Sequence, residues 1–276
     1  MLDNLPRLPV AQWASDFVDW LTSSFSFIFD PIKEVLEGLM DWIIQILEFI
    51  PPTLFIVIVM ALAFIFMKNK VLSPILIGVG LLFIYNQGLW ANLIDTMTLV
   101  IISGLISVVF GIPLGILMSK STGFETVMKP ILDFMQTMPA FVYLIPAVAF
   151  FGIGMVPGVF ASVIFSAPPT IRLTNLGIRQ ISAELIEASD SFGTTPMQKL
   201  VKVQLPLARS SIMAGVNQTI MLALSMVVIA SMIGAPGLGT EVLSSLQRAQ
   251  VGTGFVAGLG IVILAIIIDR FTQSKK

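Results

Sequence analysis

Seven apolar stretches, almost free of charged residues, constrain this chain more than any other feature of its sequence. They lie at residues 51–67, 71–85, 92–118, 131–151, 156–171, 212–233 and 252–268. An α-helix needs roughly 20 apolar residues to cross a bilayer, and only helices or closed barrels satisfy every backbone hydrogen bond in lipid. The sequence therefore predicts an all-α polytopic membrane protein of about seven transmembrane helices. The second stretch is short, and Pro168 and Pro169 interrupt the fifth, so six and eight are alternative numbers of spans.

Composition supports this class and excludes several chemistries. Of the 276 residues, 56% are hydrophobic and 11% are charged, and the mean hydropathy is +0.97, whereas an average soluble domain is about 25% charged. The chain contains no Cys and no His, which excludes disulfides, Cys/His zinc sites and histidine acid–base catalysis. The net charge of −1 indicates no basic patch, so we expect no nucleic-acid partner.

The basic residues predict the orientation of the chain. With the N-terminus outside, only Arg7, Lys33 and Arg248 of the 15 Lys and Arg residues lie outside. The positive-inside rule therefore predicts an outer N-terminus, an inner C-terminus and an odd number of spans. The cytoplasmic positions are then Lys68, Lys70, Lys120, Lys129, Arg172, Arg179, Lys199, Lys202, Arg209, Arg270, Lys275 and Lys276.

The region before the first span is amphipathic. Between residues 30 and 50 apolar side chains recur at the helical period, and the opposite face carries five charges, at Lys33, Glu34, Glu37, Asp41 and Glu48. Each charge would cost a few kcal/mol in the lipid core, so we expect a helix in the membrane interface or on the rim of the protein. A similar but weaker stripe comprises Trp13, Phe17, Leu21 and Phe25.

The longest polar cytoplasmic segment, residues 172–211, carries a spaced motif. Glu187, Ala188 and Ser189 are followed by three residues and Gly193, and nine residues later by Val203, Gln204, Leu205 and Pro206. Residues 181–192 suit a short helix whose small side chains admit another surface. Gly193 suits a backbone turn, and Pro206 would end the loop before the next span.

This motif resembles the EAA signature of permease subunits of ATP-binding-cassette (ABC) importers, Glu-Ala-Ala-x3-Gly-x9-Ile-x-Leu-Pro. Ser189 replaces the second Ala and Val203 replaces Ile. The resemblance implies a type I importer permease fold, with a coupling helix that docks on an ATPase subunit. It assigns ATPase coupling to Glu187, Ala188, Ser189, Gly193, Val203, Leu205 and Pro206.

The chain matches no Gly-x4-Gly-Lys-[Ser/Thr] phosphate-binding loop, so we expect no nucleotide or other cofactor in it. ATP and Mg would be bound by the partner. The implied partners are two copies of the ATPase, a second copy of this permease, an extracellular substrate-binding protein and membrane lipid, all at a prokaryotic cell membrane.

Longer strings are similar to the permeases of glycine betaine/proline betaine importers. They include residues 136–146, 168–172, 217–230 and 234–239, and the resemblance extends over essentially the whole chain. It implies three regions: an amphipathic extracellular or interfacial scaffold (1–50), accessory transmembrane helices (51–90) and a core importer permease domain (91–271) that holds the coupling loop 172–211.

The implied substrate guides a search for the transport path. A quaternary ammonium group donates no hydrogen bond, so its recognition relies on aromatic faces, together with donors for the carboxylate. The candidates in the fourth and sixth spans are Phe141, Tyr143, Asn217, Ser225 and Met226. For each of them, packing between helices or against lipid is the alternative.

We therefore expect a non-enzymatic subunit of an ATP-driven importer of glycine betaine or a related osmoprotectant. Alternatives are the same importer type for choline, carnitine or ectoine, and an ATP-independent osmolyte carrier or channel. A proton-driven symporter is disfavoured because Asp95, Asp133 and Asp269 lie near the ends of spans, not at their centres. An intramembrane enzyme is also disfavoured, because the sequence contains no set of residues that could form a catalytic site.

Overall fold

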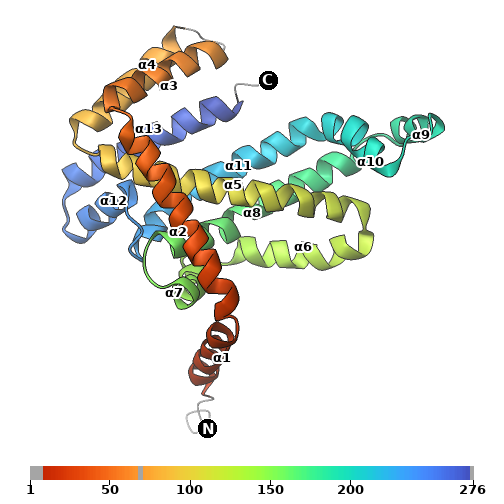
Figure 1. Ribbon diagram of the computed structural model, residues 1–276, viewed down its shortest axis with the longest axis horizontal. Coiled ribbons are helices and arrows are strands. Elements are labelled where there is room, and N and C mark those ends of the chain that lie inside the picture. The colour runs from red at the N-terminus through yellow and green to blue at the C-terminus, as the bar shows by residue number, and fades with distance from the viewer. Residues whose placement is uncertain (1–8, 68–70, 274–276) are drawn as a thin grey trace, which may run out of the picture.

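The computed structural model describes residues 9–67 and 71–273 (Figure 1). Within these residues the regular structure is helical and contains no strand. Arg7, Lys68, Lys70, Lys275 and Lys276, which entered the predicted orientation, lie outside the described residues. The elements are α1 (Val10–Ser24), α2 (Ser26–Phe49), α3 (Pro52–Phe66), α4 (Leu72–Asn86), α5 (Trp90–Lys120), α6 (Thr122–Thr137), η2 (Ala140–Tyr143), α7 (Leu144–Phe151), α8 (Met155–Arg179), α9 (Ala183–Ser191), α10 (Pro196–Lys199), η3 (Leu200–Gln204), α11 (Leu205–Ser231), α12 (Leu238–Gln247) and α13 (Val251–Gln273).

Most of the predicted apolar stretches form helices long enough to cross a membrane. Four qualify by length and composition: α5, α8, the continuous run from α10 to α11, and α13. Two bent pairs, α2 with α3 and α6 with the η2–α7 segment, raise the number to six. The predicted span 71–85 corresponds to α4, which has 15 residues and is shorter than the others.

Two expectations about the middle of the chain are wrong. Pro168 and Pro169 do not interrupt the fifth span, because α8 continues through both to Arg179 and buries both rings. The predicted span 131–151 is not one helix: α6 ends at Thr137, Pro139 precedes η2, and the bend between the two parts is 107°. Proline disfavours helical backbone at the residue before it, and Met138 is extended (ψ 135°).

The core of the fold is the contact of α5, α8 and α11. Glycines bring the backbones together: a Cβ on Gly115 of α5 would lie 2.6 Å from the carbonyl oxygen of Ile171 in α8. A Cβ on Gly215 of α11 would lie 3.0 Å from the carbonyl oxygen of Pro169. Small residues allow this approach in membranes, where packing and not hydrophobic burial holds helices together.

The N-terminal helices are amphipathic, as predicted. In Figure 1, α2 crosses the bundle close to the end that holds α12, and α1 projects beyond it. The packed side of α2 includes Phe29, Leu36 and Met40, and Phe29 stacks on Phe150 of α7 at 4.6 Å between ring centroids. The charged residues form a separate face, at Lys33, Glu34, Glu37, Asp41 and Glu48. Next to the packed side, large apolar side chains are exposed at Ile28, Ile32, Val35, Trp42, Ile46 and Phe49.

Basic residues concentrate at one end of the bundle. The end that carries α9 holds Lys120, Arg179 and Lys199, at or next to the last turns of their helices. The acidic residues Glu37 and Asp41 of α2 instead line a cavity of about 380 Å³ with the 151–157 segment and Pro236. This sorting agrees with the predicted orientation.

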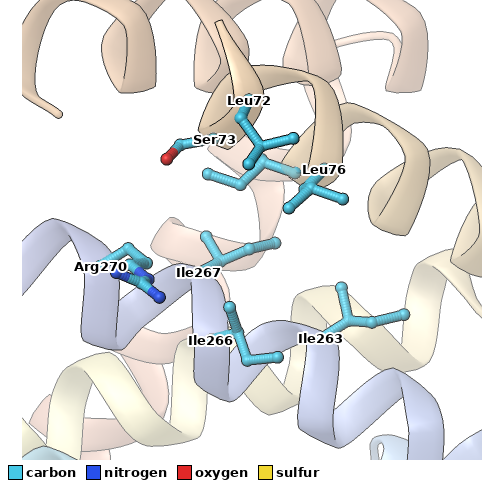
Figure 2. A pocket seen from close by; sticks show the side chains of 8 residues that line it. Leu72, Ser73, Leu76, Ile263, Ile266, Ile267 and Arg270 are labelled. Atoms are coloured by element: carbon cyan, nitrogen blue, oxygen red, sulfur yellow. The ribbon is translucent and has the colours of Figure 1, made fainter. Parts of the chain in front are cut away.

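A second cavity of about 300 Å³ separates the predicted accessory helix α4 from α13. Figure 2 shows Arg270 and Ser73 at one end of it and Leu76 and Ile263 at the other. The remaining lining residues are aliphatic: Leu72, Ile77, Ile266 and Ile267. The two helices meet where Ile263 lies against Gly80.

We predict that Gly115→Ala destabilises the protein by about 1–3 kcal/mol, because the new methyl group must displace the α8 backbone. Unfolding of the purified protein in detergent measures the effect. Gly123→Ala is the matched control, because a Cβ on Gly123 in α6 meets nothing within 4 Å. Equal stability of the two variants would contradict the close α5–α8 contact.

Candidate functional site

The motif-bearing segment projects from the bundle at the end opposite α12 (Figure 1). The segment contains fewer residues than the predicted loop 172–211, because α8 extends to Arg179 and α11 begins at Leu205. Between them, α9 forms the predicted short helix, and α10 and the π-helical turn η3 lead into α11.

Hydrogen bonds within the loop fix its shape. The hydroxyls of Ser189 and Thr194 lie 2.8 Å apart, and the Thr194 hydroxyl also donates to the Ser189 carbonyl oxygen at 2.9 Å. Thr195 and Gln198 form a reciprocal capping box at the start of α10. Asp190 pairs with Lys199, which ties α9 to α10. The loop is therefore a preformed unit.

The predicted turn at Gly193 is confirmed. Its φ is +72°, a left-handed conformation that glycine adopts at little cost and that β-branched residues resist. No atom outside its chain neighbours lies within 4 Å of the position of its Cβ. Backbone geometry, and not crowding, therefore requires glycine here.

The tip of the loop exposes apolar side chains to solvent. Phe192 is 89% exposed and Met197 is 68% exposed, and Leu185 and Val201 are also exposed. The charged residues Glu184, Glu187 and Lys202 are exposed beside them. Apolar residues rimmed by charge mark a protein-contact surface. The motif highlighted Gly193 but gave no signal for Phe192 or Met197.

The motif residues divide into exposed and supporting positions. Glu187, Ala188 and Pro206 are exposed, whereas Ser189 is buried and its hydroxyl bonds to that of Thr194. Val203 and Leu205 are half-buried, and Leu205 packs beside the cluster of Ile178, Leu200, Ala208 and Ile212. Pro206 is the second residue of α11 and directly follows the π-helical turn η3 within the continuous run from α10 to α11. Their role in coupling stays a prediction.

Only two of the five predicted path residues meet. Tyr143 and Met226 are buried in one apolar cluster, and the Tyr143 hydroxyl donates to the Met135 carbonyl oxygen at 2.6 Å. Phe141 is 58% exposed. Ser225 is exposed and donates to the Met221 carbonyl oxygen of its own helix.

Asn217 lies elsewhere, between α11 and α13. Its amide donates to Asp269 at 3.2 Å and accepts from the Thr272 hydroxyl at 2.5 Å. The nearby cavity of about 340 Å³ is lined by Arg209, Met213, Ala214, Asn217, Gln218, Thr272 and Gln273. The periodicity of a single helix could not reveal a contact between residues 52 apart.

Buried hydroxyls join the central helices, and none of them is among the residues assigned to coupling or to the transport path from the sequence. Thr219 of α11 donates to the Ser166 carbonyl oxygen of α8 and lies 2.8 Å from the Thr170 hydroxyl. Ser107 of α5 lies 3.1 Å from the Ser166 hydroxyl. Ser and Thr within apolar stretches were the available signal. Among the described residues no group of three or more Asp and Glu could hold a metal ion.

The fold is that of a type I ABC importer permease. Residues amounting to 67% of this chain superpose on 91% of a chain of the MetNI methionine ABC transporter, solved in an inward-facing conformation, with a TM-score of 0.58 at 23% identity. At this identity the match concerns the fold alone.

Sequence comparison gives the family. The model described as "Binding-protein-dependent transport system inner membrane component" matches residues 107–273, and the chain belongs to this family. It is 57% identical over 275 residues to the glycine betaine/carnitine transport permease protein GbuB of Listeria monocytogenes, with 99% of this chain and 97% of that protein covered. It is 51% identical over 275 residues to the glycine betaine transport system permease protein OpuAB of Bacillus subtilis, with 100% and 97% covered. The chain is thus a multi-pass permease component of the cell membrane, as predicted.

We predict that Gly193→Val loosens the α9–α10 loop, because the left-handed conformation costs a non-glycine residue about 1–2 kcal/mol. Amide hydrogen exchange across residues 183–199 should accelerate, while exchange in α5 and α8 stays unchanged. Gly193→Asn is the control, since Asn tolerates this conformation better. Unchanged exchange in the Val variant would show that the turn does not hold the loop.

Proposed function

We propose that this chain is the permease subunit of an ATP-driven importer of glycine betaine or a related quaternary-ammonium osmoprotectant. The observation that carries the proposal is similarity along nearly the whole chain to two permeases whose names include glycine betaine. The preformed loop with its exposed apolar tip supports the ATP-driven mechanism, because it offers a surface for a second protein.

The proposed assembly contains two copies of the permease, two copies of an ATPase subunit and an extracellular substrate-binding protein. ATP and Mg bind to the ATPase, and hydrolysis takes place there. Closure of the ATPase pair moves α9 and α10 and thereby alternates access to a central path. The binding protein delivers the solute to the end of the bundle where α2 and α12 lie. Lipid surrounds the assembly, and the aliphatic cavity between α4 and α13 has a lining suited to an acyl chain.

The substrate can be tested by uptake into proteoliposomes that contain all the subunits. We expect ATP-dependent accumulation of labelled glycine betaine that exceeds that of choline, carnitine and ectoine. Preference for one of those three solutes would replace the substrate but keep the importer. Uptake without ATP or without the ATPase would instead support an osmolyte carrier or channel.

The docking surface can be tested with Phe192→Ala. We predict that copurification of the ATPase and ATP-driven uptake both fall at least about tenfold, since truncation of an interface aromatic commonly removes more than about 1.4 kcal/mol of binding. Phe49→Ala is the matched control, because Phe49 is also 89% exposed but lies at the end of α2. Equal losses in the two variants would argue against docking at the loop.

A further inference from the structure

An ion-pair cluster around the buried carboxylate of Glu125 joins three helix ends beside the loop, with the side chains of Arg179 and Lys129 35% and 62% exposed. Glu125, in the first turn of α6, is 8% exposed. Its carboxylate accepts from Arg179 at 2.8 Å, from Asn175 at 3.0 Å and from Lys129 at 3.1 Å. Arg179 also donates to the side-chain oxygen of Asn175 at 3.0 Å and to the carbonyl oxygen of Met118 at 2.8 Å. The cluster thus connects the last turns of α5 and α8 to the first turn of α6.

The geometry of this cluster fixes the register of α6 on α8. The apolar contact between these helices, around Leu132, Ala167 and Ile171, is non-directional and tolerates sliding. Charge-assisted hydrogen bonds from a planar guanidinium are directional and hold one geometry. Because Glu125 is buried, moving α6 away from α8 would remove its bonds to Arg179 and Asn175 and leave only Lys129 of its own helix as a partner, which is unfavourable.

The cluster lies between the loop and the apolar cluster of Tyr143 and Met226. Arg179 is the last residue of α8, and only residues 180–182 separate it from α9. From Glu125, α6 runs back along the bundle to Met135, whose carbonyl oxygen accepts the hydrogen bond of Tyr143. A displacement of α9 therefore has a continuous, hydrogen-bonded route to the segment after the α6 break.

We propose that Glu125, Lys129, Asn175 and Arg179 are positioning residues that make α6 move together with the end of α8. Movement of the α9–α10 loop then displaces the η2–α7 segment and the Tyr143–Met226 contact. This inference rests on the proposed function and adds the route by which the loop acts on the membrane part of the protein. None of the four residues belongs to the EAA motif.

The same two helices supply a matched control. Arg172 of α8 pairs with Asp133 of α6 at 2.6 Å, and its side chain is exposed to about the same extent as that of Arg179, 38% against 35%. The two pairs differ in the carboxylate, because the Asp133 side chain is 65% exposed and that of Glu125 is 11% exposed. A solvent-exposed pair contributes little. If any ion pair between α6 and α8 sufficed, loss of either one would have the same effect.

The test is the number of ATP molecules hydrolysed per solute imported by the complete complex. We expect Glu125→Gln to raise this ratio at least about fivefold, the lower end of typical coupling between sites. Arg179→Lys keeps the charge but loses the planar guanidinium, so it should raise the ATP-to-solute ratio less than Glu125→Gln does. Asp133→Asn should change this ratio by less than about twofold. An unchanged ratio in Glu125→Gln would overturn the inference, whereas a wild-type complex that imports no betaine would overturn the proposed function instead.

A rescue experiment separates positioning from general stability. The chain has no Cys, so Asp133→Cys with Arg172→Cys introduces two unique thiols on α6 and α8. In the Glu125→Gln background, joining them with a short bifunctional thiol reagent should return the ratio toward that of the wild type. The same variant without the reagent is the control. Failure of the formed cross-link to lower the ratio would show that the α6–α8 link is not what Glu125 supplies.

Discussion

The close approach of α5, α8 and α11 is the contact on which the rest of the structure depends. In a bilayer, lipid solvates apolar side chains as well as protein does, so these helices are held by tight packing and by hydrogen bonds between them. Glycines at 115 and 215 admit the neighbouring backbone of α8, and the Thr219, Thr170 and Ser166 contacts join α8 to α11 within the bundle. Because α8 and α11 also carry the two ends of the loop, the same contact determines where α9 stands.

The loop and the bundle form one mechanical unit. Two continuous helices, α8 and α11, enter and leave the loop, and internal hydrogen bonds keep its shape when no partner is bound. The Glu125 cluster adds α6, which leads to the break after Thr137. Movement at the exposed tip is therefore transmitted by rigid helices and not absorbed by a flexible linker. Such coupling suits the proposed role, in which the motion is supplied by a separate ATPase.

Much of this could be read from the sequence because its signals are local. Apolar length predicted the helices, and the spacing from Glu187 to Pro206 predicted a helix, a turn at Gly193 and the start of α11. The wrong predictions are those in which packing between helices overrides a local sequence rule. Pro168 and Pro169 were read as an interruption, yet α8 keeps both in a helix packed between α5 and α11. The path residues were grouped by residue type, and only Tyr143 and Met226 meet.

The sequence by itself determined that the chain is a helical membrane protein, where its basic residues concentrate and where its EAA-like motif lies. These properties depend on composition and on spacings of a few residues. Only the tertiary structure decided that Asn217 meets Asp269, that Glu125 meets Arg179, and that Phe192 stands at an exposed tip. The first two contacts depend on the rotation and register of whole helices, because packing between segments about 50 residues apart sets them and no periodic pattern in the chain reveals them. The exposure of Phe192 depends on how the α9–α10 loop folds on itself.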